Sequence, residues 1–243
     1  ALLNSMSSNS ASRKEISVTI TEGQTVKQIF ELLEKEGVST VEKLEDMAAN
    51  HDYAFSFLQD IPLGDPTRLE GYLFPDTYKF YMGEDPKYVI NKMLVNFDSK
   101  VDDAVRQKIS ETGYSIRDIL TIASMIEKET DGTDRTTIAS VIYNRLNNPG
   151  ASTAGYLQID ATIQYVLPEG KIVQESDYQG VDSPYNTYKN KGLPPGPIAN
   201  PGMESITAAL NPQSTNYYYY ALGDDHLHHF FSSYAEHQAF LNS

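Results

Sequence analysis

The chain has 243 residues, with 33 acidic side chains against 19 basic ones and a formal net charge of −14. This charge argues against non-specific binding to the phosphate backbones of nucleic acids. The absence of Cys excludes a disulfide framework, a thiolate zinc site and a cysteine nucleophile. Hydrophobic residues make up 40% of the chain, so we expect a folded protein with one large domain, or a main domain plus a small one.

The start of the chain differs in composition from the rest. Residues 1–15 are rich in Ser and Asn and show no periodicity, so we interpret them as a linker or stalk remnant. No run of about 18 apolar residues exists that could cross a bilayer, and no signal peptide pattern is present.

The next segment predicts a strand followed by two helices. Apolar and polar residues alternate over 16–20, which is typical of a strand. Thr25 and Gln28 form a capping-box pattern that opens a helix, and Gly37 ends it. A second helix is predicted over about 40–58. This unit is a candidate for a small module of its own.

The remainder mixes helices, loops and a few strands. Residues 69–81 are aromatic and interrupted by Gly and Pro, which indicates extended chain or short strands. Residues 147–201 are predicted to be mostly loop. Helices are predicted over 85–97, 102–110, 115–130, 134–146, 161–166, 203–210 and 234–241, and strands over 217–222 and 229–232. The overall pattern is α+β.

Helical periodicity singles out Glu127. Placed at 100° per residue, Glu127 falls on the apolar stripe of its helix, whereas Lys128 and Glu129 point away from it. We expect burial and the negative end of the helix dipole to favour the protonated carboxylic acid that a general acid requires. The alternative is a structural carboxylate at a frayed helix end, bonded to a loop N–H or to Arg135 or Arg145.

Other polar groups lie in or beside the long loop. Gln158 and Asp160 are suited to binding sugar hydroxyls, or Asp160 simply caps the helix that follows. The segments 183–188 and 192–201 contain prolines that stiffen the chain. A stiff loop with exposed Tyr and Asn side chains is a good wall for a polar substrate, and its alternative is an inert surface loop.

Three histidines near the C-terminus resemble a metal cluster at first sight. His226, His228 and His229 lie on or beside a predicted hairpin, where alternation directs His228 and His229 to opposite faces. No HExxH motif is present and no Cys assists them. We therefore expect no metal site here.

Several segments occur together in the order of one known family. The sequence resembles the endolytic murein transglycosylases of the MltG or YceG-like type. Two departures are Ala161, where the family usually has Pro, and a looser ending around 226–232. The matching segments are LEGYLFPDTY (69–78), ASMIEKET (123–130), IASVIYNRL (138–146), LQID (157–160), SPYNTY (183–188), GLPPGPIANPG (192–202), ESITAALNP (204–212) and HFFSSYAEH (229–237).

The resemblance implies a division of the chain and a set of site residues. It implies a small LysM-like subdomain at 16–60 and a YceG-like catalytic domain of mixed α+β structure at 61–243. The first Glu of the family's EKE motif is the catalytic acid, which is Glu127 here. Substrate-binding candidates from motif positions are Gln158, Asp160, Tyr185, Asn186, Asn200 and Glu70, of which Asp160 and Glu70 either orient sugars or brace the fold.

The resemblance also implies a reaction. Such enzymes cut the β-1,4 bond between N-acetylmuramic acid (MurNAc) and N-acetylglucosamine (GlcNAc) without water, within glycan strands, and leave 1,6-anhydro-MurNAc ends that terminate strand elongation. The acid protonates the glycosidic oxygen, and its carboxylate then takes the proton of the attacking C6 hydroxyl. No cofactor or metal is implied. The implied partners are peptidoglycan strands and cell-wall synthases. The resemblance also implies that an N-terminal helix anchors the protein in the cell membrane, with its catalytic part on the extracytoplasmic face.

Three other functions are weighed against this one. A non-catalytic peptidoglycan-binding scaffold would bind glycan without cutting it. A lysozyme-like muramidase would need a path for water and a second carboxylate about 5–9 Å from the acid. An aminodeoxychorismate lyase would need pyridoxal phosphate on a lysine, and Lys128 points away from the apolar stripe of its helix.

Overall fold

The computed structural model describes residues 14–130 and 132–243. The predicted stalk at 1–15 lies almost wholly outside them. The α+β class is confirmed. In chain order the elements are β1 (Glu15–Thr19), α1 (Val26–Lys35), α2 (Val41–Asn50), the short 3-10 helix η1 (Ser56–Leu58), β2 (Thr77–Tyr81), α3 (Pro86–Lys100), α4 (Asp103–Thr112), α5 (Ile116–Glu129), α6 (Arg135–Asn147), α7 (Asp160–Gln164), α8 (Glu175–Gly180), α9 (Met203–Leu210), β3 (Tyr219–Leu222), β4 (His228–Phe231) and α10 (Tyr234–Leu241).

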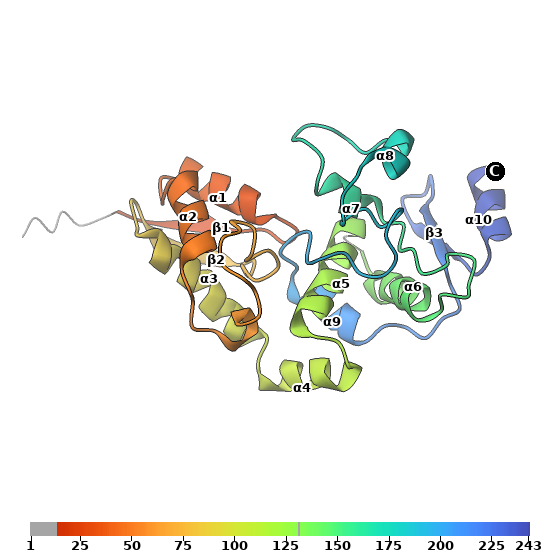
Figure 1. The fold of residues 1–243 in the computed structure, drawn as a ribbon, viewed down its shortest axis with the longest axis horizontal. Coiled ribbons are helices and arrows are strands. Elements are labelled where there is room, and N and C mark those ends of the chain that lie inside the picture. The colour runs from red at the N-terminus through yellow and green to blue at the C-terminus, as the bar shows by residue number, and fades with distance from the viewer. Residues whose placement is uncertain (1–13, 131) are drawn as a thin grey trace, which may run out of the picture.

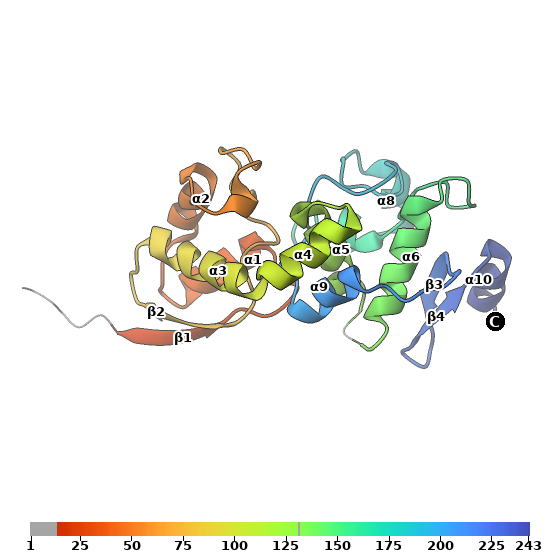
Figure 2. The ribbon, with the colours of Figure 1, turned by 90° about the horizontal axis from the view of Figure 1, so that it is seen from below.

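The elements form two lobes side by side, and α4 leads from the first to the second (Figures 1 and 2). The N-terminal lobe contains β1, α1, α2, β2 and α3. The predicted first strand is confirmed, and it pairs antiparallel with β2, with Val18 opposite Tyr78. Because β1 has its partner at 77–81, the predicted boundary at residue 60 falls inside this lobe. The LysM-like character of 16–60 stays a prediction.

The helix ends in this lobe follow local chemistry. The capping box of Thr25 and Gln28 is confirmed, and Gly37 lies at the end of α1 with φ +75°. The second helix is shorter than the expected 40–58, since α2 ends at Asn50. His51 has an extended backbone, and the chain then places the ring of Tyr53 in the core. A helix that continued past Asn50 would have kept this ring on the surface of the helix instead.

The C-terminal lobe is built around α5, which packs against α6, α7 and α9. All the residues from 119 to 126 are buried, so α5 is enclosed on every side rather than on one stripe. The predicted long loop is largely confirmed, but it contains the additional helix α8. The β3–β4 hairpin and α10 close the end of the lobe (Figure 2). None of the helices described is long and apolar enough to cross a bilayer.

A buried amide joins the two lobes. Asn200 is fully buried, and its Oδ1 accepts hydrogen bonds from the N–H groups of Gly71 and Leu73 at 3.0 and 2.9 Å. Its Nδ2 donates to the carbonyl of Gln24 and to Glu70, both at 3.0 Å. Every polar atom of this side chain is therefore used to hold the proline-rich loop against the N-terminal lobe.

A buried carboxyl completes this joint. Glu70 is 4% exposed and accepts hydrogen bonds from the N–H of Val26, the first residue of α1, and from the hydroxyl of Tyr165, each at 3.0 Å. Burial raises the pKa of Glu70 to about 8, although these hydrogen bonds act in the opposite direction. Glu70 thus braces α1 against the second lobe.

Candidate active site

Two hollows meet on the C-terminal lobe. The first, of about 750 Å³, lies at the end of α5 and is lined by Glu127, Lys128, Glu129, Thr130, Gly132, Thr133, Asp134, Leu222, His226, Leu227 and His228. The second, also of about 750 Å³, includes Glu129, Arg145, Gln158, Asp160, Glu175, Tyr178, Tyr188, Tyr219, Tyr220, Leu222, His228 and Tyr234 in its lining. Because both hollows share Glu129, Leu222 and His228, they form one continuous depression, which we call the groove.

Glu129 lies where the two hollows meet. Its carboxylate accepts a hydrogen bond of 2.6 Å from the hydroxyl of Tyr220. Burial raises the pKa of Glu129, and the negative charge of Asp160 raises it further, while Tyr220, His228 and Arg145 act against the shift. A carboxyl whose pKa is raised beside a groove is a candidate general acid.

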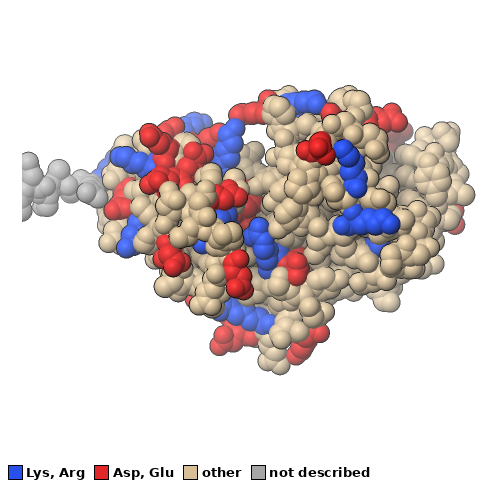
Figure 3. Space-filling model, viewed as in Figure 1, with Lys and Arg blue, Asp and Glu red and all other residues tan. Residues whose placement is uncertain are grey.

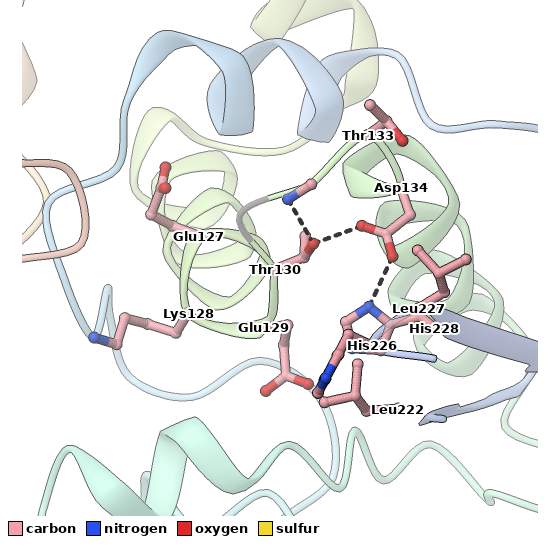
Figure 4. A pocket seen from close by; sticks show the side chains of 11 residues that line it. Glu127, Lys128, Glu129, Thr130, Thr133, Asp134, Leu222, His226, Leu227 and His228 are labelled. Carbon is pink, nitrogen blue, oxygen red and sulfur yellow. Dashed lines mark hydrogen bonds and ion pairs between the residues drawn. The ribbon is translucent and has the colours of Figure 1, made fainter. Parts of the chain in front are cut away.

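Glu127 points to a different side of α5 from Glu129 (Figure 4). Its side chain is 7% exposed and lies 3.9 Å from the guanidinium of Arg135. It also accepts a hydrogen bond of 3.0 Å from the N–H of Gly202, just before α9. The loop N–H and the arginine that the sequence offered as a structural alternative are thus both present, although Glu127 also lines the first hollow.

The two glutamates show where helical periodicity misleads. Glu129 does point to a different side of α5 from Glu127, as predicted, but it is not thereby exposed. The β3–β4 hairpin covers that side of α5 and buries the carboxylate under Tyr220. A helical wheel finds one buried face, and α5 is buried on several.

Two of the predicted substrate-binding residues lie in the second hollow. Asp160, the first residue of α7, accepts hydrogen bonds from the hydroxyls of Tyr188 at 2.6 Å and Tyr178 at 3.1 Å. These two rings stack, with centroids 4.1 Å apart and planes 3° apart. Gln158 is exposed, with its backbone at φ +52°, a conformation that costs a non-glycine residue energy and is found at functional sites. The structure thus brings Gln158 and Asp160 together with Glu129.

The other four predicted residues lie outside the groove. Tyr185 packs its ring on Tyr165 with centroids 5.1 Å apart. Asn186 is fully buried and donates to two backbone carbonyls of the α8 region. Asn200 and Glu70 form the joint between the lobes. The polar atoms of these last three side chains bind other parts of the chain, so the structure gives them bracing contacts, and their roles toward substrate stay predictions.

The histidines separate as alternation predicts. His228 lines the groove, and its Nδ1 lies 2.7 Å from Asp134. His229, its neighbour, pairs instead with Asp225 at 2.9 Å, away from both hollows. Among residues 14–130 and 132–243, no group of three or more His, Cys, Asp or Glu side chains is placed to hold a metal ion.

Several groove residues are not assigned to the site by the sequence. The helical wheel places Glu129 away from the apolar stripe, and His228 is considered only as a metal ligand. Tyr188 ends the segment 183–188, in which Tyr185 and Asn186 are the predicted contacts. Tyr220 lies far from α5 in the chain, and no local pattern marks it.

Comparison with known proteins adds independent information. The sequence model of the YceG-like family matches residues 1–243. A Bacillus subtilis protein named endolytic murein transglycosylase is 43% identical over 154 residues, which are 63% of this chain and 41% of that protein. A Streptococcus pneumoniae protein of the same name is 34% identical over 178 residues, 68% of this chain and 31% of that protein. The matches thus span less than half of either relative.

A crystal structure has the same fold. A putative yceG-like protein from Listeria monocytogenes superimposes with a TM-score of 0.77 and 32% sequence identity. The match covers 92% of this chain and 75% of that one. It therefore extends over both lobes and the joint between them.

Proposed function

Because the chain belongs to the YceG-like family, we propose that it cleaves the glycan strands of peptidoglycan as an endolytic murein transglycosylase. The observation that carries the proposal is a groove with a buried carboxyl at its centre, in a chain similar to two proteins of that name. The reaction is a lyase reaction on a polysaccharide. It breaks the β-1,4 bond between MurNAc and GlcNAc without water and leaves a 1,6-anhydro end.

The surroundings of the groove suit a sugar polymer. The second hollow contains five Tyr side chains, whose rings offer apolar faces. The hydroxyls of Tyr178, Tyr188 and Tyr220 donate to Asp160 or Glu129 and so hold the two carboxyl groups in place. In the view of Figure 3, the C-terminal lobe presents a broad surface of uncharged side chains. Since the whole chain carries −14, recognition rests on such sugar contacts rather than on attraction to anionic cell wall.

The proton donor is one of the two glutamates of the EKE motif. The family motif gives this task to Glu127, and that assignment stays a prediction. The geometry favours Glu129, because its pKa is raised by burial and it lies where the two hollows meet. The contacts of Glu127 with Gly202 and Arg135 suit a carboxylate that links α5 to its neighbours.

The proposed steps need one acid and no second protein nucleophile. The acid donates its proton to the glycosidic oxygen as an oxocarbenium-like centre develops at C1 of MurNAc. The C6 hydroxyl of the same sugar attacks C1, and because this nucleophile is intramolecular its effective concentration is high. A base then takes the hydroxyl proton, a task that the family mechanism gives to the same carboxylate.

The site of action comes from the family resemblance. The protein acts at the extracytoplasmic face of the cell membrane, held there by an N-terminal helix, and shortens strands beside the cell-wall synthases that make them. Cleavage by this chain alone is therefore the first point to establish.

The test uses uncrosslinked glycan strands and mass spectrometry of the products. We expect 1,6-anhydro-MurNAc ends from the unchanged protein and their loss in Glu129→Gln, with Glu127→Gln as the competing variant and the exposed Glu111→Gln as the control. Loss of the 1,6-anhydro ends in Glu127→Gln alone would show that Glu127, the first Glu of the motif, is the acid. Binding without cleavage would mean a scaffold, and the proposed function would be wrong.

One observation keeps the muramidase as a second candidate. Asp160 lies in the same groove as Glu129, and its charge acts on that carboxyl. A hydrolase would use such a second carboxylate, either as a nucleophile or to activate water. Reducing-end MurNAc among the products, in place of the anhydro form, would establish hydrolysis.

A further inference from the structure

A second proton-binding side chain lies beside Glu129. His228, at the start of β4, lines both hollows. Its side chain is 12% exposed, and its ring stands edge-on to Tyr220 with centroids 5.6 Å apart and planes at 87°. Tyr220 is the donor to Glu129, so the imidazole and the buried carboxyl share a neighbour that fixes both.

The imidazole is also held through Nδ1. This nitrogen lies 2.7 Å from Oδ2 of Asp134, whose Oδ1 accepts a hydrogen bond of 2.6 Å from the hydroxyl of Thr130 (Figure 4). The Thr130 hydroxyl in turn accepts from the N–H of Gly132 at 2.9 Å. This chain of hydrogen bonds runs from the end of α5 to the start of β4.

Asp134 makes this contact in place of a more ordinary one. Asp134 stands at the N-cap position of α6, but its side chain makes no capping hydrogen bond. An N-cap aspartate ordinarily accepts a hydrogen bond from a free N–H group in the first turn of its helix. The carboxylate of Asp134 binds His228 at the groove and leaves the end of α6 without a side-chain cap. We interpret its position as serving to orient the histidine.

The contact fixes the tautomer of His228. A carboxylate only accepts hydrogen bonds, so Nδ1 carries the hydrogen and the neutral ring presents a lone pair at Nε2. Within the parts of the chain that the structure describes, Nε2 makes no hydrogen bond. An oriented acceptor is thus available in the groove.

We propose that His228, oriented by Asp134, takes the proton of the saccharide hydroxyl that attacks in the groove. This proposal rests on the proposed function, and it assigns to His228 the role of the base that takes the hydroxyl proton. The bond from C1 to the glycosidic oxygen breaks and the bond from C1 to O6 forms. The acid's proton goes to the glycosidic oxygen, and the O6 proton goes to Nε2. Water then carries that proton back to the acid, so nothing further is consumed.

The variants separate this role from a structural one. His228→Asn keeps an amide N–H that can bind Asp134 but has no group at the Nε2 position. Asp134→Asn keeps the shape and the contact with Thr130 but favours the wrong tautomer of the ring. We expect each to lower kcat on glycan strands about 100-fold or more, as removal of a general base does, with KM and the thermal midpoint nearly unchanged.

His229→Asn is the matched control. His229 lies on the same hairpin as His228 and pairs with an aspartate too, but it lines neither hollow. The kcat of His229→Asn should therefore stay within about twofold of that of the unchanged protein. Full activity of His228→Asn or Asp134→Asn would overturn the proposal. A rise in KM together with falls in kcat and in the thermal midpoint would show a structural role and would also overturn it.

An NMR measurement works even if the chain cuts nothing. In ¹⁵N-histidine-labelled protein, Nε2 of His228 should give the signal of a nitrogen without hydrogen, and Asp134→Asn should remove that signal. Titration with a GlcNAc tetrasaccharide should move the Nε2 resonance of His228 and leave that of His229. A protein without cleavage but with this shift would contradict the proposed function alone, whereas an unmoved Nε2 in a cleaving protein would contradict the role of His228.

Discussion

Glu70→Gln should make the stability of the protein less dependent on pH. Glu70 is nearly completely buried in the joint, and burial raises its pKa from an ordinary 4.5 to about 8. Glutamine keeps the shape of the side chain and an oxygen that can accept from the N–H of Val26 and the amide of Asn200. Its amide can donate to the oxygen of Tyr165. The substitution therefore removes the charge and leaves the contacts.

The direction of the pH effect follows because Glu70 binds its proton more tightly in the folded protein than in the unfolded chain. A carboxyl with a higher pKa in the folded protein keeps its proton there and releases it on unfolding, so its contribution to stability is complete below pH 4.5. That contribution is lost as the pH rises toward about 8. At about 1.4 kcal/mol for each pKa unit, a difference of about 3.5 bounds the total loss near 5 kcal/mol.

Urea unfolding at pH 5.5 and pH 8.5 measures the effect. Between these values we expect the unchanged protein to lose roughly 3 kcal/mol relative to Glu70→Gln, since part of the titration lies below pH 5.5. Glu111→Gln, exposed on α4, should follow the unchanged protein at both values. A free-energy gap between Glu70→Gln and the unchanged protein that is the same at both pH values would refute the reasoning.

Two further substitutions test the packing and the acid. Gly71→Ala adds a methyl group 2.6 Å from the ring of Pro197 at φ +91°, whereas Gly64→Ala, at φ +104°, meets no atom within 4 Å. We expect losses of unfolding free energy of about 3 kcal/mol and about 1–2 kcal/mol, respectively, and equal losses in urea unfolding would contradict the packing argument. Tyr220→Phe removes the donor that favours ionised Glu129, so the pKa of that carboxyl rises and the alkaline limb of the pH–activity profile moves to higher pH. An unmoved limb would show that Glu129 is not the titrating acid.

Local chemistry made the helix starts predictable. The capping boxes that begin α1 at Thr25 and α5 at Ser115 depend on residues three apart, and such pairs can be read directly. The partner of β1 could not be read, because pairing with 77–81 depends on the closure of a long loop. The early end of α2 was missed for a similar reason, since the burial of Tyr53 is decided by the rest of the core.

The site was predictable only in part. The family motifs led to α5, to Gln158 and to Asp160, and these do lie at the groove. They also led to Asn186 and Asn200, whose side chains are fully buried and bonded within the protein. A family motif shows which residues recur but not what each of them does. A buried residue that braces the fold and a residue that contacts substrate cannot be told apart in a single sequence.

The pairing of β1 with β2 also sets an order of events during synthesis. The ribosome makes the residues between the two strands in about 3–12 s at ordinary rates. For that time the edge of β1 that later pairs with β2 is free and can bind other chains. Its exposed positions, Glu15, Ser17 and Thr19, are all polar, and Glu15 later pairs with Lys79 at 3.4 Å. Apolar residues at these positions would therefore cause aggregation of nascent chains before they changed the stability of the finished fold.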